Sequence, residues 1–132
     1  MPELPEVETI KRQLSQLITG LTIKDIEIRN SKSFLGEKKE IIGKKIEGLK
    51  RFGKMIQIVI NGKKDLLIHL KMTGQLIYIS ASGKSSEIIL PAKSTRVIFT
   101  FTDNSHLYFN DNRKFGWIRV VDDEELKKKS SL

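Results

Sequence analysis

The chain has 132 residues, 39% of them hydrophobic, and a formal net charge of +8 at pH 7, which is typical of one domain with one modest core. The excess of Lys and Arg favours a polyanionic partner, either nucleic acid or an anionic membrane surface. Because the sequence has no long apolar stretch, no signal-peptide pattern and no cysteine, we expect a soluble intracellular domain without disulfides or thiolate metal sites.

The first predicted element is an amphipathic helix that ends near Gly20, a residue common at helix C-termini. Pro5 suits a first helical turn because its missing N–H would have no partner there. Glu3, Glu6 and Glu8 place negative charge at the end where the helix dipole favours it. An apolar stripe at helical spacing follows, formed by Val7, Ile10, Leu14, Leu17 and Ile18.

After Gly20 the pattern becomes typical of short strands, with turns predicted at residues 61–62 and 103–105. The segments 30–40 and 80–94 show no regular pattern, and the tail over 122–129 predicts a short helix. Strands are predicted at 23–28, from Ile46 and Leu49 onward, and at 55–60, 66–70, 76–79, 96–102, 106–109 and 117–121. One helix before about eight strands predicts an α+β, mainly β fold: a two-layer β-sandwich or flattened barrel with an N-terminal helix and a short C-terminal helix.

The N-terminus carries a candidate for covalent chemistry. Residue 2 is small, so Met1 should be removed, which leaves Pro2 with a free secondary amine. An α-amine has a pKa of about 7.7–8.0, and its attack on an aldehyde-level carbon gives an iminium that acts as an electron sink. Glu3 could transfer protons as general acid and base. From these residues alone, a well-capped helix start is the simpler interpretation.

The string Met-Pro-Glu-Leu-Pro-Glu-Val-Glu-Thr at residues 1–9 resembles the start of formamidopyrimidine-DNA glycosylases. Three further segments, at 50–54, 69–76 and 111–117, resemble that family in the same order. The resemblance implies a base-excision repair domain that removes 8-oxoguanine and formamidopyrimidines from duplex DNA. It also implies a Schiff base at Pro2 and cleavage of the abasic strand.

By resemblance, Pro2, Glu3 and Lys54 are the catalytic residues, and Lys54 lies near the reacting sugar and its phosphate. His69 is assigned to a backbone phosphate, and Glu6 is counted among the DNA-contacting residues. Without the resemblance, a solvated edge lysine and a buried, hydrogen-bonded histidine would be the expected interpretations of Lys54 and His69.

The resemblance assigns three further side chains to the inside of the duplex. Met72 fills the place of the damaged base, a role that suits a flexible side chain. Arg113 hydrogen-bonds the orphaned cytosine, and Phe115 is a wedge beside it. We therefore expect these three side chains to converge on one basic face, although a methionine considered alone more often fills a core.

The chain departs from the family pattern at several positions. Lys71 replaces the usual Gly, which adds charge and affects the turn. Asn112 replaces Pro, and Lys114 replaces Arg and keeps its charge. Ser94 replaces a histidine that contacts DNA in relatives. Lys93 and Arg96 could supply charge near Ser94.

The resemblance also implies a C-terminal helix–two-turn–helix region and a four-cysteine zinc finger, neither of which these 132 residues contain. We expect residues 1–132 to form a single domain with no metal or other cofactor of its own, zinc belonging only to that C-terminal region. The expected partner is double-stranded DNA with an oxidised purine or an abasic site, bound by a monomer at the nucleoid in the bacterial cytoplasm. The alternative is a catalytically weak or inactive DNA-binding fragment that lacks its clamp domain.

Overall fold

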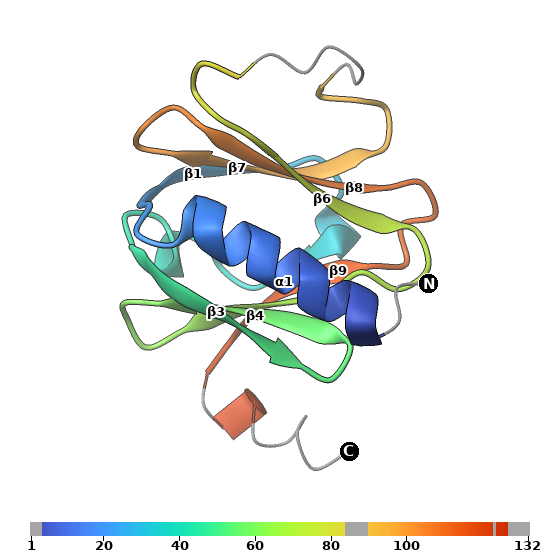
Figure 1. Cartoon of the computed structure of the whole chain (residues 1–132), viewed down its shortest axis with the longest axis horizontal. Coiled ribbons are helices and arrows are strands. Elements are labelled where there is room, and N and C mark those ends of the chain that lie inside the picture. Colours follow the sequence, from blue (N-terminus) through green and yellow to red (C-terminus); the bar gives the residue numbers. More distant parts are fainter. Residues whose placement is uncertain (1–3, 84–89, 123, 127–132) are drawn as a thin grey trace.

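A computed structural model describes residues 4–83, 90–122 and 124–126, which form two facing β-sheets and a helix beside them (Figure 1). Pro2 and Glu3 lie outside the described residues, as do residues 127–129 of the predicted tail helix. The main elements are α1 (Leu4–Ile18), β1 (Ile23–Ile28), β2 (Phe34–Leu35), β3 (Ile46–Phe52), β4 (Met55–Ile60), β5 (Asp65–His69), β6 (Gly74–Ile79), β7 (Thr95–Phe101), β8 (His106–Asp111) and β9 (Trp117–Val121).

The strands are divided between a four-stranded sheet with the order β1-β7-β8-β6 and a five-stranded sheet with the order β2-β9-β5-β4-β3. All pairs are antiparallel except β2 with β9. The two sheets face each other, as the two-layer prediction required (Figure 1). The predicted α+β, mainly β sandwich is therefore confirmed.

Helix α1 lies along the opening between the two sheets and packs on β3 and β4 (Figure 1). Its apolar stripe places Val7, Leu14 and Ile18 in the core. The helix ends before Gly20, whose φ of +92° favours glycine and whose N–H donates to the carbonyl of Ile46 at 2.8 Å. Within the described residues, no helix has the length and apolarity that crossing a membrane requires.

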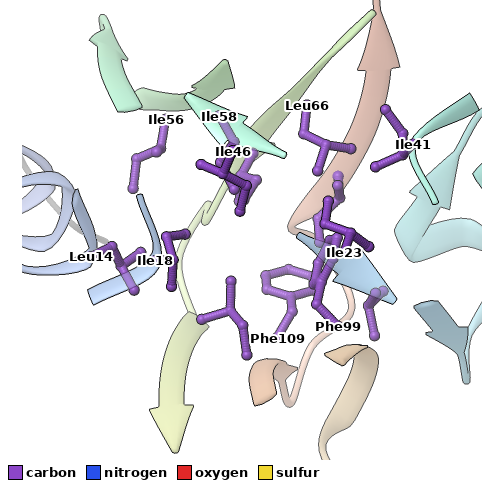
Figure 2. Close-up of a cluster of buried hydrophobic side chains, with 14 of the residues drawn as sticks. Leu14, Ile18, Ile23, Ile41, Ile46, Ile56, Ile58, Leu66, Phe99 and Phe109 are labelled. Atoms are coloured by element: carbon purple, nitrogen blue, oxygen red, sulfur yellow. The ribbon is translucent and has the colours of Figure 1, made fainter. Parts of the chain in front are cut away.

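The core lies between the inner faces of the sheets. Figure 2 shows Leu14 and Ile18 of α1 pointing into the same cluster as Ile56 and, from the opposite sheet, Phe109. These side chains are at most 4% exposed, so each contributes roughly 1.5–3 kcal/mol of apolar burial. This burial, contributed by both sheets and the helix, joins them into one rigid support for the loops at the sandwich ends.

One strand was not predicted. Residues 30–40 were expected to be irregular, yet Phe34–Leu35 forms β2, flanked by the short 3-10 helices η1 (Ser31–Ser33) and η2 (Lys38–Glu40). The two residues pair in parallel with β9, and Phe34 is buried. A strand of two residues is too short for a period-two pattern, so this part of the prediction was wrong for lack of a local signal.

The start of the C-terminal tail is helical over residues 124–126, as predicted. The carboxylate of Asp122 accepts the N–H of Glu125 at 2.9 Å, and the carboxylate of Glu125 accepts the N–H of Asp122 at 3.3 Å. This reciprocal arrangement is a capping box, which satisfies donors that a helix start leaves without partners.

Candidate functional site

Two connections cross from one sheet to the other and carry three of the predicted DNA-contacting residues. The β5–β6 loop (residues 70–73) carries Met72, which is 52% exposed. The β8–β9 loop (residues 112–116) carries Arg113, which is exposed, and Phe115, which is 56% exposed. Neither large apolar side chain contributes to the core, so both are available for contact with a partner.

The strand pairing forces these two loops to lie side by side. His69, the last residue of β5, pairs with Trp117, the first residue of β9. Gly74, the first residue of β6, pairs with Asp111, the last residue of β8. Both loops therefore connect the same two neighbouring strand ends, so the sheet topology places the loops that carry Met72, Arg113 and Phe115 side by side.

A single carboxylate ties the two loops together. Asp111 is only 1% exposed, and it accepts hydrogen bonds from the Thr73 hydroxyl in the β5–β6 loop and from backbone N–H groups in the β8–β9 loop. The N–H of Arg113 lies 3.1 Å and that of Gly116 2.7 Å from its oxygens. Fixed charge-assisted bonds of this kind are stronger than neutral ones, so Asp111 fixes the relative position of the loops.

The β8–β9 loop closes tightly at its end. A Cβ on Gly116 would lie 2.8 Å from the carbonyl oxygen of His69 and 2.9 Å from a carboxylate oxygen of Asp111. Only glycine fits there without a shift of the backbone, which explains the Phe-Gly pair at this point of the sequence.

Lys54 lies at the same end of the sandwich. It occupies the two-residue turn directly before β4, after Gly53, whose φ is +62°. The next residue, Met55, pairs with His69. Arg51 donates to the carbonyl of Gly53 at 3.1 Å and forms an ion pair with Glu8 of α1 at 3.2 Å. The turn that carries Lys54 is thus linked to the helix.

His69 is half-buried between cationic groups. Its Nδ1 accepts the N–H of Lys71 at 3.0 Å, and its ring lies 5.6 Å from that of Trp117. Burial, together with the charges of Lys71, Lys54 and Arg119, lowers the pKa of His69 below its usual value. Because Nδ1 accepts an N–H, it carries no proton itself, so the ring in this geometry is the neutral tautomer with its proton on Nε2.

A hollow of about 300 Å³ opens beside Met72. Most of its lining is polar and comes from three segments of the chain, including Ser94, whose carbonyl accepts the N–H of Asp111 at 2.8 Å. The lining residues are Met72, Thr73, Gln75, Ser94, Asn110, Asp111 and Asn112. Ser94, which replaces the family's histidine, therefore lies at the edge of the predicted contact face.

Of the other predicted residues, Glu6 is exposed in the first turn of α1, whereas Pro2 and Glu3 lie outside the described residues. The sequence did not indicate that Asp111 joins the two loops or that Arg119 lies close enough to His69 to lower its pKa. An Asp that precedes a loop ending in Gly is a recognisable turn signal, but Arg119 had no local signal. The described residues contain no group of three or more His, Cys, Asp or Glu side chains suited to a metal ion.

The comparisons with known proteins agree on one family. The profile of the formamidopyrimidine-DNA glycosylase N-terminal domain matches residues 1–118. The formamidopyrimidine-DNA glycosylases of Ligilactobacillus salivarius and Geobacillus kaustophilus are each 38% identical, over 92% and 100% of this chain. These alignments cover 43% and 48% of the two relatives, so the chain spans about half the length of the curated relatives it matches.

The solved structures that resemble this chain belong to the same family. Two structures of the Lactococcus lactis protein, one in complex with DNA containing FAPY-dG and one with DNA containing an abasic site, have a TM-score of 0.82 and 30% identity to this chain. They match 96% of it, and the matched part covers 46% and 45% of their own chains. The chain thus belongs to the formamidopyrimidine-DNA glycosylase family, and its residues 1–118 match that family's N-terminal domain.

Proposed function

We propose that this chain is the catalytic domain of a base-excision repair glycosylase, which removes 8-oxoguanine and formamidopyrimidines from double-stranded DNA and then acts as an abasic-site lyase. Family membership and the lesion-containing DNA bound by the Lactococcus lactis relatives support the proposal. Because the matched relatives are bacterial, we place the activity at the nucleoid in a bacterial cytoplasm. The domain acts as a monomer and uses no metal or other cofactor of its own.

The grouping of Met72, Arg113 and Phe115 on two adjoining loops carries this proposal. When a damaged nucleotide rotates out of the duplex, the gap in the stack, the orphaned base and the neighbouring pair each need a partner. A flexible apolar side chain, a guanidinium fork and an aromatic wedge meet those needs. The same end of the sandwich carries Lys54 and His69, which suit contacts with phosphate.

In the proposed reaction, the amine of Pro2, freed by removal of Met1, attacks C1′ of the damaged nucleotide, and the bond from C1′ to the base breaks. The proton of the attacking amine passes to the departing base. The electron pair of the Pro2 nitrogen then forms the iminium with C1′ as the bond from C1′ to the ring oxygen breaks, and Glu3 donates a proton to that oxygen. Loss of a proton from C2′ then sends an electron pair into the iminium, and expulsion of the 3′ phosphate cuts the strand. Lys54 lies by the sugar and phosphate, Glu6 contacts the DNA, and hydrolysis of the iminium restores Pro2.

The test is borohydride trapping of the 132-residue chain on a duplex with one abasic site. Reduction of the iminium should give a stable protein–DNA adduct, and peptide mapping should place the DNA on Pro2. Acetylation of the N-terminal amine should abolish trapping, whereas Pro2→Gly, which keeps a primary amine, should retain part of it. An adduct that forms equally well with an acetylated N-terminus, or no adduct with the parent chain, would contradict the proposal.

A further inference from the structure

Lys71 has a backbone conformation that lysine rarely adopts. Its φ is +53°, in the left-handed region where a Cβ crowds the backbone and glycine does not. The hydrogen bond from its N–H to Nδ1 of His69 helps to hold the residue there. Backbone strain of this kind occurs preferentially at binding and catalytic sites, so the position warrants a functional explanation.

Cationic groups gather around His69, and the Lys71 ammonium is one of them. Lys71, Lys54 and Arg119 all act electrostatically on His69, and the guanidinium carbon of Arg119 lies 4.0 Å from the ring centroid of Trp117. Within residues 4–83, 90–122 and 124–126, the Lys71 ammonium has no ion pair or hydrogen bond, and the buried Nε of Arg119 has no hydrogen-bond partner. Cations gathered in this way favour an anionic ligand.

His69 completes the donor set. Because its Nδ1 accepts the N–H of Lys71, the proton of the neutral ring is on Nε2, which can donate to a ligand. An ammonium and a ring N–H that come from residues two positions apart can bind two oxygens of one phosphodiester.

We propose that Lys71 is a further DNA-binding residue, whose ammonium binds a backbone phosphodiester together with the Nε2–H of His69. The inference rests on the proposed function, because the ligand is a phosphate of the duplex that the domain acts on. Met72 follows Lys71 directly and is 52% exposed, so DNA that contacts Met72 brings its backbone within reach of the Lys71 side chain.

The experiment compares three variants of the 132-residue chain. Lys71→Met removes the charge but keeps the Cβ and the apolar stem. Lys71→Gly removes the charge and also relieves the strain at φ +53°. Lys63→Met is the matched control, since it removes one exposed lysine from the loop between β4 and β5, at the other end of β4 from Lys54.

Binding to a duplex with a tetrahydrofuran abasic-site analogue is measured by fluorescence anisotropy at several salt concentrations. The association constant falls as salt rises, and we expect Lys71→Met and Lys71→Gly to make the slope of its logarithm against log salt shallower by about 0.9. This change corresponds to a loss of roughly eightfold in affinity at 0.1 M salt. Lys71→Gly should at the same time raise the thermal unfolding midpoint, so that affinity and stability change in opposite directions. Lys63→Met should keep the parent slope.

A parent-like slope in both Lys71 variants, or an equal reduction in Lys63→Met, would overturn the role of Lys71 while leaving the proposed function intact. Failure of the parent chain to bind the duplex or to be trapped on an abasic site would instead contradict the proposed function, and the role of Lys71 with it.

Discussion

Asp111 accepts hydrogen bonds from two loops at once, and through them it sets the positions of Met72, Arg113 and Phe115. Its backbone takes part as well, because the Asp111 carbonyl accepts the guanidinium Nε–H of Arg96 at 2.8 Å. Asp111 thus links the β5–β6 and β8–β9 loops through its carboxylate and Arg96 of β7 through its carbonyl. We infer that it positions the side chains proposed to contact DNA without itself touching DNA.

Replacing Asp111 with Asn should weaken the link between the loops. One carboxylate oxygen accepts the N–H of Arg113 and the other accepts that of Gly116, and an amide nitrogen in place of either oxygen cannot accept. Leaving such buried donors without partners should lower the free energy of unfolding by about 1–3 kcal/mol, which urea denaturation can measure. Asp103→Asn is the control, since the carboxylate of Asp103 accepts hydrogen bonds within its own turn, from Ser105. Parent-like stability of the Asp111 variant, or an equal loss in the control, would contradict this role.

Motifs indicated the candidate contact residues, but they did not indicate the residues that support them. Met72 and Phe115 were expected on one exposed face, and the strand pairing places their loops together. Lys71 was expected to affect its turn, but only the structure gives the φ of +53° and the bond to His69. Those features depend on how β5, β6 and β9 meet, which no local pattern records.

At the scale of elements, the link between α1 and β3 determines how the helix start lies relative to the Lys54 turn. Glu8 accepts ion pairs from Lys11 and Arg12 on its own helix and from Arg51 on β3. Hydrogen bonds from these cations, Lys11 and Arg12 first, lower the pKa of Glu8 from 4.5 to about 2. Arg51 in turn holds the carbonyl of Gly53 beside Lys54.

Glu8→Gln should therefore reduce stability in a pH-dependent way. A carboxylate whose pKa falls on folding adds stability that is complete above its unfolded pKa of 4.5 and is lost as the pH falls toward about 2. The variant should unfold at a slightly lower temperature than the parent at pH 7, and the gap should narrow below pH 4.5. Glu47→Gln, an exposed change elsewhere on β3, is the control. A gap that stays constant down to pH 2.5 would show that the ion pairs do not act as described.

The helices and strands were predictable where the repeat of apolar residues extended over enough positions to detect. Helix α1 and eight of the nine strands follow from apolar spacing, whereas β2 does not. At the end of β2, a Cβ on Gly36 would lie 2.6 Å from the Cβ of Val120 on β9, and the φ of Gly36 is +124°. The course of this segment is therefore set by a tertiary contact, which spacing along the sequence cannot indicate.

At the scale of the whole molecule, the chain pairs a complete hydrophobic core with a contact face on one end of the sandwich. Its net charge of +8 favours electrostatic attraction to DNA, and its alignments cover less than half of each of the relatives compared. We therefore expect the chain to fold alone and to bind duplex DNA weakly and salt-sensitively, with a Kd of about 10⁻⁴–10⁻⁶ M at physiological salt. Composition favoured a polyanionic partner, either nucleic acid or an anionic membrane surface, and the end of the sandwich proposed to meet DNA follows only from motifs and topology.

The most direct test of that contact face is a nitrogen-15 NMR titration of the 132-residue chain with a duplex containing an abasic-site analogue, since binding in this range is well suited to chemical-shift mapping. The largest shifts should fall in three segments that meet at one end of the sandwich: residues 53–55, 69–73 and 112–117. The turns over 61–64 and 103–105, at the opposite end, should change little. Shifts centred on those two turns, with the β5–β6 and β8–β9 loops unchanged, would contradict the account.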